Sequence, residues 1–223
     1  MKKFKYVLAM DPSGNYKEGH GTTGWVLLTA DEKLLARGWI SAKDFNCREA
    51  YWNAHTELIK FNNRKYGKDL IVVIENYVLY RDRSINQTNS ELETPRLLGV
   101  IQWACWQLKQ NYTLQLAANV KQRWSDDLLY RERILYKDRN TVRHTGSNLT
   151  LNSKHERDAF RHGLHFILTR NGSEERKPKY EQIKGVKGNV RSNYQSRPGK
   201  TEGYSSTARN NKRHSSNTRV WFS

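Results

Sequence analysis

The chain has 223 residues and a formal net charge of +17, because 39 lysines and arginines outnumber 22 acidic residues. This length suits one sizeable domain, and the charge favours a polyanionic partner, either nucleic acid or an anionic membrane surface. No apolar run is long enough to span a membrane, and Asp11 interrupts the first run too early for a signal peptide. Two cysteines far apart in sequence make neither a zinc knuckle nor a disulfide framework, so we expect a reducing, cytoplasmic setting.

The N-terminal part predicts three consecutive strands, at residues 3–11, 24–30 and 33–41. Apolar runs closed by turn residues are typical of buried strands, and the short polar connection at 30–33 predicts a hairpin between the second and third. The first strand ends on a lone carboxylate, Asp11, followed by Pro12. Taken by itself, Asp11 fits an ordinary Asp-Pro turn, so its role depends on the rest of the chain.

A helix and a fourth strand follow. Apolar residues at helical spacing predict a helix at 47–66, ended by Gly67: Ala50, Ala54, Leu58 and Phe61. Residues 70–75 contain four β-branched residues and predict a strand covered on both faces. This strand also ends on a lone carboxylate, Glu75, and the polar residues 76–93 after it predict a loop.

The second half of the pattern contains three more helices and one strand. Thr94 and Pro95 predict an N-cap and first turn for a helix at 94–110, in which Gly99 would allow close approach to a neighbour. A short strand at 113–117, a highly charged helix at 119–137, a polar loop at 139–153 and a helix at 155–169 complete the order. This order indicates an α/β fold, a sheet with helices on its faces.

Residues 171–223 lack periodic apolar residues and form a separate basic tail, with 12 lysines and arginines against four acidic residues. Such a composition predicts disorder in the free chain. Aromatic residues are spaced through the tail, which suits phosphate neutralisation and base stacking on nucleic acid; a solubilising tail without a defined partner is the alternative. The predicted domain therefore comprises residues 1–170.

Three carboxylates are predicted to meet. Asp11 and Glu75 end two strands, and Asp158 lies in the first turn of the last helix, on the same face as His155 three residues earlier. Each has a plainer explanation, as a strand-end surface residue, a helix N-terminal residue or a helix-dipole partner. Together they mark the crevice at the carboxyl ends of strands, where α/β sheets place their sites. Clustered carboxylates favour Mg²⁺ or Mn²⁺, and two such ions can promote phosphodiester cleavage.

Four stretches resemble the RuvC-like Holliday junction resolvases of the ribonuclease H-like superfamily, in order and spacing over about residues 5–170. They are VLAMDPSG with the following TTGWVLL, IVVIENY, ETPRLLGVIQWACWQL with LQLAANVKQRW, and KHERDAFRHGLHFIL. The resemblance implies a five-stranded mixed sheet, its first three strands antiparallel, with helices on both faces. The chain departs from the family at Ser13, which follows Asp-Pro where the family usually has glycine, and in the enlarged turn NYKEGHG. These departures suggest a divergent, phage-type member.

The resemblance also implies roles for single residues. Asp11, Glu75, His155 and Asp158 would be the catalytic and metal-binding set, holding two Mg²⁺ or Mn²⁺ ions, and Lys121 would lie near the scissile phosphate. Each is also explicable as an ordinary surface or helix residue. Further contacts to nucleic acid are expected from charged residues near this site: Lys17, Arg81, Arg83, Lys121 and Arg123.

These observations predict a metal-dependent, structure-selective endonuclease that cleaves Holliday junctions or other branched DNA. Two symmetric cuts require two centres, so a homodimer is expected, with the helix carrying Trp103 and Trp106 as a candidate contact. No membrane partner and no small-molecule substrate are expected, and a phage-encoded protein would act in the host cytoplasm. The alternatives are another ribonuclease H-like nuclease, acting on RNA–DNA hybrids or in packaging, and a non-catalytic basic protein that binds nucleic acid.

Overall fold

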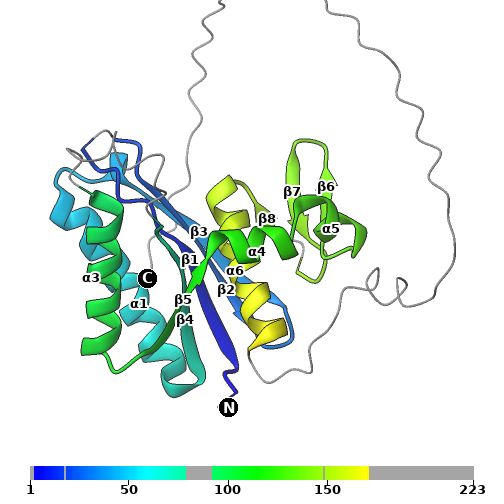
Figure 1. The fold of residues 1–223 in the computed structure, drawn as a ribbon, viewed down its shortest axis with the longest axis horizontal. Helices are drawn as coiled ribbons and strands as arrows, with labels where there is room; N and C mark the ends of the chain where they lie inside the picture. Colours follow the sequence, from blue (N-terminus) through cyan, green and yellow to red (C-terminus); the bar gives the residue numbers. More distant parts are fainter. Residues whose placement is uncertain (1–2, 18, 79–91, 148, 171–223) are drawn as a thin grey trace, which may run out of the picture. The chain divides into compact units, whose positions relative to one another are not determined.

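The computed structural model of this protein describes residues 3–17, 19–78, 92–147 and 149–170. Within these ranges the chain forms a central sheet with three long α-helices and one short α-helix around it. A small second sheet has a short helix of its own (Figure 1). No helix of this described part is long and apolar enough to cross a membrane. The predicted disorder of residues 171–223 falls outside the described residues, as does most of the loop predicted at 76–93.

The central sheet has five strands in the order β3-β2-β1-β4-β5. Their bounds are β1 Tyr6–Asp11, β2 Thr22–Thr29, β3 Leu34–Ser41, β4 Leu70–Asn76 and β5 Asn111–Leu116. β1 pairs antiparallel with β2, and β2 with β3, whereas β1–β4 and β4–β5 are parallel. The mixed five-stranded sheet expected from the resemblance is therefore confirmed, with β5 beginning two residues earlier than predicted.

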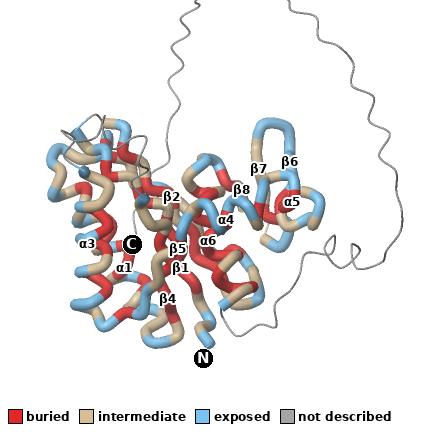
Figure 2. Tube along the Cα trace, viewed as in Figure 1, coloured by how far each residue is buried: buried red, intermediate tan, exposed pale blue. Residues whose placement is uncertain are grey.

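Helices cover both faces of this sheet, as predicted. α1 (Arg48–Tyr66) and α3 (Glu93–Gln107) lie on one face, and α6 (Lys154–Thr169) lies on the other (Figure 1). In β1 the alternation is complete, because Leu8 and Met10 pack under α1 and α3 while Val7 and Ala9 pack under α6. Figure 2 shows the resulting continuous burial along β1 and β4.

The same two-residue alternation determines on which face of the sheet the strand-end carboxylates lie. Asp11 follows Val7 and Ala9 on the α6 side of β1, and Glu75 follows Ile71 and Val73 on the α6 side of β4. Because β1 and β4 are parallel neighbours, with Met10 opposite Ile74, both carboxylates emerge at one edge of the sheet and on one face.

The segment predicted as one charged helix at 119–137 is instead three elements. α4 (Ala117–Arg123) and α5 (Asp126–Arg131) are separated by Ser125, whose hydroxyl accepts from the Leu128 amide as an N-cap, and β6 (Leu135–Asp138) follows. The polar loop predicted at 139–153 contains two further strands, β7 (Thr141–His144) and β8 (Thr150–Leu151). Strands β6, β7 and β8 form an antiparallel sheet, which we call the accessory sheet.

Three details of the predicted helices were wrong. The buried stripe of α1 is Tyr51, His55, Leu58, Ile59 and Asn62, so of the predicted apolar set only Leu58 is buried, and Phe61 is 39% exposed. α3 begins at Glu93 with Leu92 as its N-cap, because the Thr94 hydroxyl instead accepts from the Gly14 amide at 3.0 Å. Gly99 faces open space and brings no neighbour close.

A buried polar network fixes the chain just after Asp11. The Tyr51 hydroxyl donates to the Ser13 carbonyl at 2.5 Å, and the Ser13 amide donates to the Thr23 hydroxyl at 3.3 Å. His55 completes the network, since Nδ1 donates to the Tyr51 carbonyl and Nε2 accepts from Thr23, both at 2.8 Å. Complete satisfaction of these buried groups specifies one geometry for the turn.

Two glycines bring α6 against the sheet. A Cβ on Gly24, which pairs with Asp11 across β1–β2, would lie 2.2 Å from the His155 carbonyl carbon and 2.4 Å from the Glu156 nitrogen. A Cβ on Gly163, two turns along α6, would lie 2.6 Å from Leu28 Cδ1. The helix that carries His155 therefore approaches β1 and β2 as closely as backbone atoms allow.

Replacing Gly24 with alanine is expected to destabilise the fold by about 2 kcal/mol or more, because backbone atoms of α6 must move. Gly99→Ala is the matched control, and it should stabilise the fold by about 0.5–1 kcal/mol because it adds only helix propensity. Urea unfolding measures both changes. Equal effects of the two substitutions would contradict the close approach at Gly24.

Stability should also fall in mild acid through His55. Burial lowers the pKa of His55 from 6.5 to about 4, so between these values the unfolded chain binds a proton that the folded chain does not. Stability is therefore complete above about pH 6.5 and is lost as the pH falls, by about 2 kcal/mol between pH 7 and pH 5 from this residue. The urea unfolding free energy of the wild type, compared at both pH values with His55→Gln, isolates this contribution; parallel pH profiles would contradict it.

Candidate active site

The residues predicted as catalytic come together at the edge where β1 and β4 end. Asp11 Oδ2 accepts a 2.7 Å hydrogen bond from His155 Nδ1. Lys121 Nζ, from α4, lies 3.2 Å from Asp158 Oδ2 and 3.8 Å from Glu75 Oε1. Four separate elements, β1, β4, α4 and α6, thus supply one cluster of three carboxylates, a histidine and a lysine.

The first turn of α6 is held in place by its own capping box. The Ser153 hydroxyl accepts from the Glu156 amide at 3.0 Å, and the Glu156 carboxylate accepts from the Ser153 amide at 2.8 Å. Glu156 is fully buried and also pairs with Arg37 of β3 at 3.0 Å. These contacts fix the positions of His155 and Asp158 on either side of Glu156.

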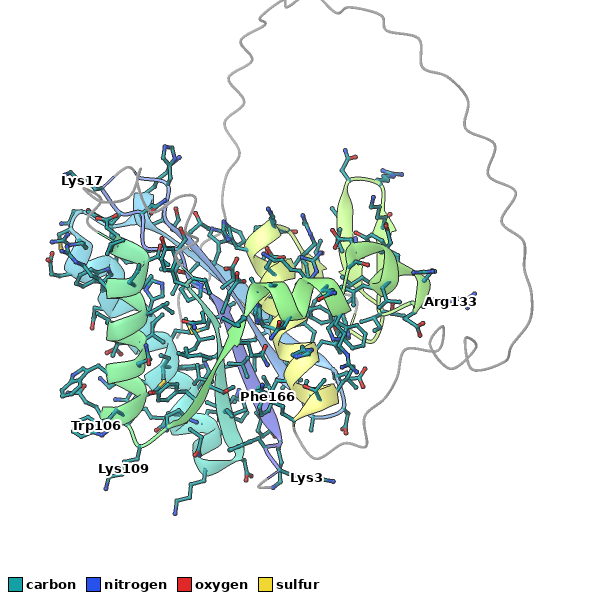
Figure 3. The ribbon with its side chains drawn as sticks, viewed as in Figure 1. Lys3, Lys17, Trp106, Lys109, Arg133 and Phe166 are labelled. Atoms are coloured by element: carbon teal, nitrogen blue, oxygen red, sulfur yellow. The ribbon has the colours of Figure 1, made fainter. Side chains whose placement is uncertain are left out.

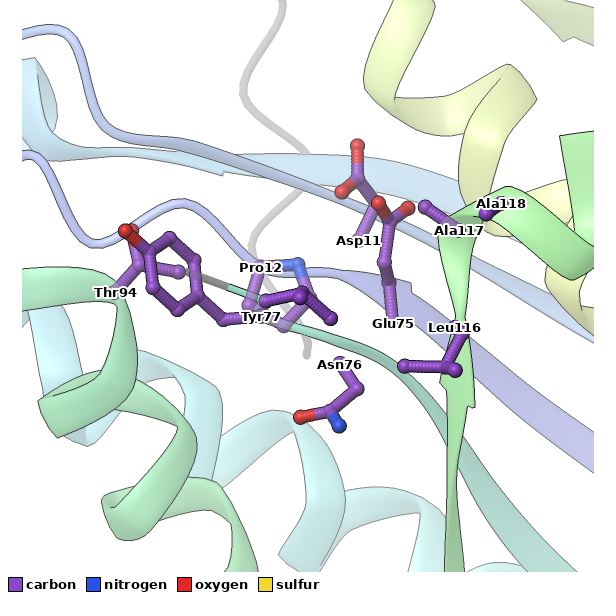
Figure 4. Close-up of a pocket in the computed structure, with 10 residues that line it drawn as sticks. Asp11, Pro12, Glu75, Asn76, Tyr77, Thr94, Leu116, Ala117 and Ala118 are labelled. Carbon is purple, nitrogen blue, oxygen red and sulfur yellow. The ribbon is translucent and has the colours of Figure 1, made fainter. Parts of the chain in front are cut away.

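A pocket of about 380 Å³ opens beside two of the carboxylates. Its lining residues come from the ends of β1, β4 and β5 and from the start of α3 and α4: Asp11, Pro12, Glu75, Asn76, Tyr77, Val78, Thr94, Leu116, Ala117 and Ala118. In Figure 4 the carboxylates of Asp11 and Glu75 lie next to each other at one side, and Leu116, Ala117 and Ala118 form the adjoining wall. The pocket therefore combines a carboxylate pair with a largely apolar wall.

Burial and neighbouring carboxylates change the pKa of Asp11. Burial, together with the charges of Glu75 and Asp158, raises the pKa of Asp11 to about 6, although the hydrogen bond from His155 opposes the change. That hydrogen bond, with the charges of Asp11 and Asp158, raises the pKa of His155 above its ordinary value. His155 therefore holds its proton more firmly than an isolated histidine would.

Glu75 is compensated differently. Burial alone would raise the pKa of Glu75, but the hydrogen bond and charge of His162 and the charge of Lys121 lower it below the ordinary value. The pKa of Lys121 is raised by Glu75 and Asp158 against partial burial. The lysine therefore remains charged between two carboxylates.

Three residues that the sequence pattern did not reveal complete the site. His162 is fully buried, and its Nε2 donates to Glu75 at 3.0 Å while Nδ1 lies 2.9 Å from Gln115 Oε1. Gln115 is the cross-strand neighbour of Glu75 in β5. Arg161 pairs with Asp158 and also reaches Asp126 of α5. The available signal was helical spacing, since His162 lies seven residues after His155 and four after Asp158, on the same face.

The donors fit a divalent cation in chemical type. Three carboxylates are the oxygen ligands that Mg²⁺ and Mn²⁺ prefer, and the charges of Glu75 and Asp158 add to burial in raising the pKa of Asp11. In the described part of the chain, however, no three acidic, histidine or cysteine side chains are grouped as a ready-made metal site. The chain's own cations contact Asp158 and Glu75 instead.

The predicted nucleic-acid contacts are spread more widely. Lys17 lies on the loop after β1 and beside the start of α3, where its amide donates to Glu93 (Figure 3). Arg123 ends α4 near His165, whose pKa burial and the Arg123 charge lower to about 4. Lys121 is the predicted contact that lies among the carboxylates. Arg81 and Arg83 fall outside the described residues.

No protein-family profile and no curated protein sequence matches the chain. Several solved structures are similar to it, among them two of RuvC. RuvC of Thermus thermophilus in complex with a Holliday junction substrate gives a TM-score of 0.52 at 13% identity, over 75% of this chain and 96% of that one. Another Thermus thermophilus RuvC structure gives 0.51 at 17% identity, over 75% and 97%. At these identities the likeness establishes the fold, which is the RuvC-like form of the ribonuclease H-like fold.

Removing His162 should disturb Glu75 through lost positioning. His162→Ala leaves a cavity and takes the buried donor from Glu75, and we expect a loss of about 2–4 kcal/mol in urea unfolding. His162→Gln retains a donor at a similar reach and should recover a large part of that loss. If the two variants are equally destabilised, His162 acts only by filling space.

Proposed function

We propose that this chain is a divalent-metal-dependent endonuclease that cleaves Holliday junctions or other branched DNA by phosphodiester hydrolysis. The observation that carries the proposal is the convergence of Asp11, Glu75 and Asp158, from three separate elements, with Asp11 and Glu75 lining an open pocket. The net charge of +17 supplies attraction for a polyanion around this acidic centre. The likeness to a RuvC bound to a Holliday junction substrate supports the choice of branched DNA.

The proposed roles follow from the position of each side chain. Asp11 and Glu75 would hold Mg²⁺ or Mn²⁺ from the pocket side, with Asp158 and His155 completing the set. A bound ion would supply activation of water and stabilisation of the leaving oxygen. Lys121, whose side chain is 44% exposed, would bind the scissile phosphate. The binding of two ions remains a prediction.

His155 is placed to move a proton. Its Nδ1 donates to Asp11, which leaves Nε2 to exchange a proton with water or with the departing oxygen. In hydrolysis, water adds to phosphorus and the bond to the 3′ oxygen breaks, leaving a 5′-phosphate and a 3′-hydroxyl. The Asp11 hydrogen bond fixes the ring orientation that this exchange needs.

One observation favours the non-catalytic alternative. Each carboxylate already has a cationic or histidine partner within the chain: His155 for Asp11, His162 for Glu75, and Arg161 for Asp158. Such a cluster is stable without a metal, as a basic nucleic-acid-binding scaffold would require. The catalytic proposal therefore needs a direct test on cleavage.

The wild type should cut an end-labelled synthetic four-way junction in Mg²⁺ or Mn²⁺. Asp11→Asn and Glu75→Gln should each reduce the cleavage rate by about 10²-fold or more, because each removes a charge from the proposed ion site. Junction binding, measured by mobility shift without divalent metal, should persist in both variants. Glu57→Gln, at an exposed carboxylate paired with Lys60 on α1, is the matched control and should leave the rate unchanged.

The substrate panel separates the alternatives. A duplex, a fork and an RNA–DNA hybrid of the same sequence are offered with the junction, and preference for the hybrid would favour another ribonuclease H-like nuclease. Failure of the wild type to cut any branched DNA with either ion sinks the proposal. Cleavage that survives in Asp11→Asn and Glu75→Gln would remove the carboxylates from the mechanism.

We also propose that the enzyme acts as a homodimer in the cytoplasm, in contact through α3. Trp103 and Trp106 stack on each other with centroids 4.8 Å apart while remaining 57% and 67% exposed. Large apolar side chains left in water favour association. Replacing both tryptophans with glutamate should convert a dimer to a monomer in sedimentation equilibrium, whereas Tyr136→Glu on the accessory sheet should not. An unchanged mass would place the contact elsewhere.

A further inference from the structure

The accessory sheet is attached firmly to the helix that carries the candidate site. Leu135 of β6 and Leu151 of β8 are each 1% exposed and share a core with Phe160 of α6. The His144 ring of β7 lies on Phe160 with centroids 5.5 Å apart. Because only two residues, Asn152 and Ser153, separate β8 from α6, the sheet has a fixed position relative to His155 and Asp158.

The other face of this sheet points away from that core. Tyr136 pairs with Arg143 across β6–β7, and Arg143 pairs with Thr150 across β7–β8. Strand alternation puts these three residues on the face opposite to Leu135 and Leu151. The outward row therefore consists of an aromatic ring, 37% exposed, an arginine and a hydroxyl.

The turns at the ends of β6 add positive charge. Arg133, before β6, and Arg139, after it, are both exposed and adopt left-handed backbone angles, with φ of 55° and 54°. Figure 3 shows Arg133 pointing outward from this end of the molecule. Asp138, on the outward face of β6, is paired with Arg143 at 3.1 Å, so the added positive charge of this surface comes from Arg133 and Arg139.

We infer that the accessory sheet is a second nucleic-acid contact, which binds the sugar–phosphate backbone of a duplex arm adjoining the strand to be cut. The inference rests on the proposed function. Its chemistry is that of phosphate recognition, because arginines present several donors to phosphate oxygens. Single-strand binding relies on several stacked aromatic rings, whereas the outward row of this described sheet has one, so a duplex backbone fits better.

Rigid attachment gives this contact a use in substrate choice. The carboxylates engage one scissile phosphate, while the accessory sheet reaches a different part of the nucleic acid at a set distance and angle. Branched DNA presents two duplex arms at once, and linear duplex presents one. Two contacts held in fixed geometry bind more tightly to the substrate that satisfies both.

The test compares two double variants with the same charge loss. Arg133→Gln with Arg139→Gln alters the accessory sheet. Arg64→Gln with Lys109→Gln alters exposed residues before β4 and β5, at the edge of the central sheet opposite to the carboxylates. Lys109, like Arg133 and Arg139, has a left-handed backbone, with φ of 51°, so one position of the control pair is matched in backbone conformation.

Binding of the full chain to a synthetic four-way junction is measured without divalent metal, from 50 to 300 mM salt. Each lost phosphate contact should lower the slope of log affinity against log salt by about 0.9. The accessory variant should lose about two such contacts and bind on the order of tenfold more weakly at 150 mM salt. The control variant should keep the wild-type slope. Equal losses in both variants, or none in either, overturn the inference.

Two further outcomes separate this inference from the proposed function. If the wild type binds the junction but never cuts it, and only the accessory variant loses salt slope, the accessory-sheet contact is supported and the nuclease function is contradicted. If the wild type cuts the junction and the accessory variant keeps the wild-type salt slope, the accessory-sheet contact is wrong and the proposed nuclease function stands. The single variant Arg139→Gln, at an exposed turn, should show a loss of about 0.9 in slope if the double variant proves unstable.

Discussion

The close packing of α6 on β1 and β2 is the constraint on which the rest of the site depends. Gly24 and Gly163 remove the side chains that would hold the helix away from the strands. At that distance the first three turns of α6 place His155 on Asp11 and His162 on Glu75. A helix displaced by the width of one methyl group would break both contacts, because hydrogen bonds weaken steeply beyond about 3.2 Å.

This packing brings three carboxylates close together, and positively charged side chains of the same chain pair with them. Asp158 is brought to the carboxylates of β1 and β4 by the same turn that brings His155. Arg161, one turn further on, neutralises Asp158 and joins α6 to α5 through Asp126. At Asp11 the pKa stays raised, chiefly because the carboxylate is buried, and the charges of Glu75 and Asp158 add to this effect.

The sequence predicts the parts of this arrangement that depend on apolar periodicity. Buried strands ending at Asp11 and Glu75 follow from runs of apolar residues, and the shared face of His155 and Asp158 follows from helical spacing. The accessory sheet was missed because Trp124, Leu128 and Leu135 are all buried and their spacing also fits a helix, although Trp124 is the C-cap of α4, Leu128 lies in α5 and Leu135 begins β6. His162 and the His55 network were missed because nothing in a polar residue's type reveals whether it is buried with a partner.

The internal pairing also explains how an acidic centre can serve a polyanion. Three bare carboxylates would repel a phosphate before it reached them. Lys121, between Glu75 and Asp158 and half exposed, presents a cation at that point instead. On the proposed function, an arriving phosphate would compete with Glu75 and Asp158 for Lys121, and the carboxylate oxygens that the lysine released would then be available to hold a divalent metal ion. Substrate and metal would then bind with positive coupling, since each makes the site more favourable for the other.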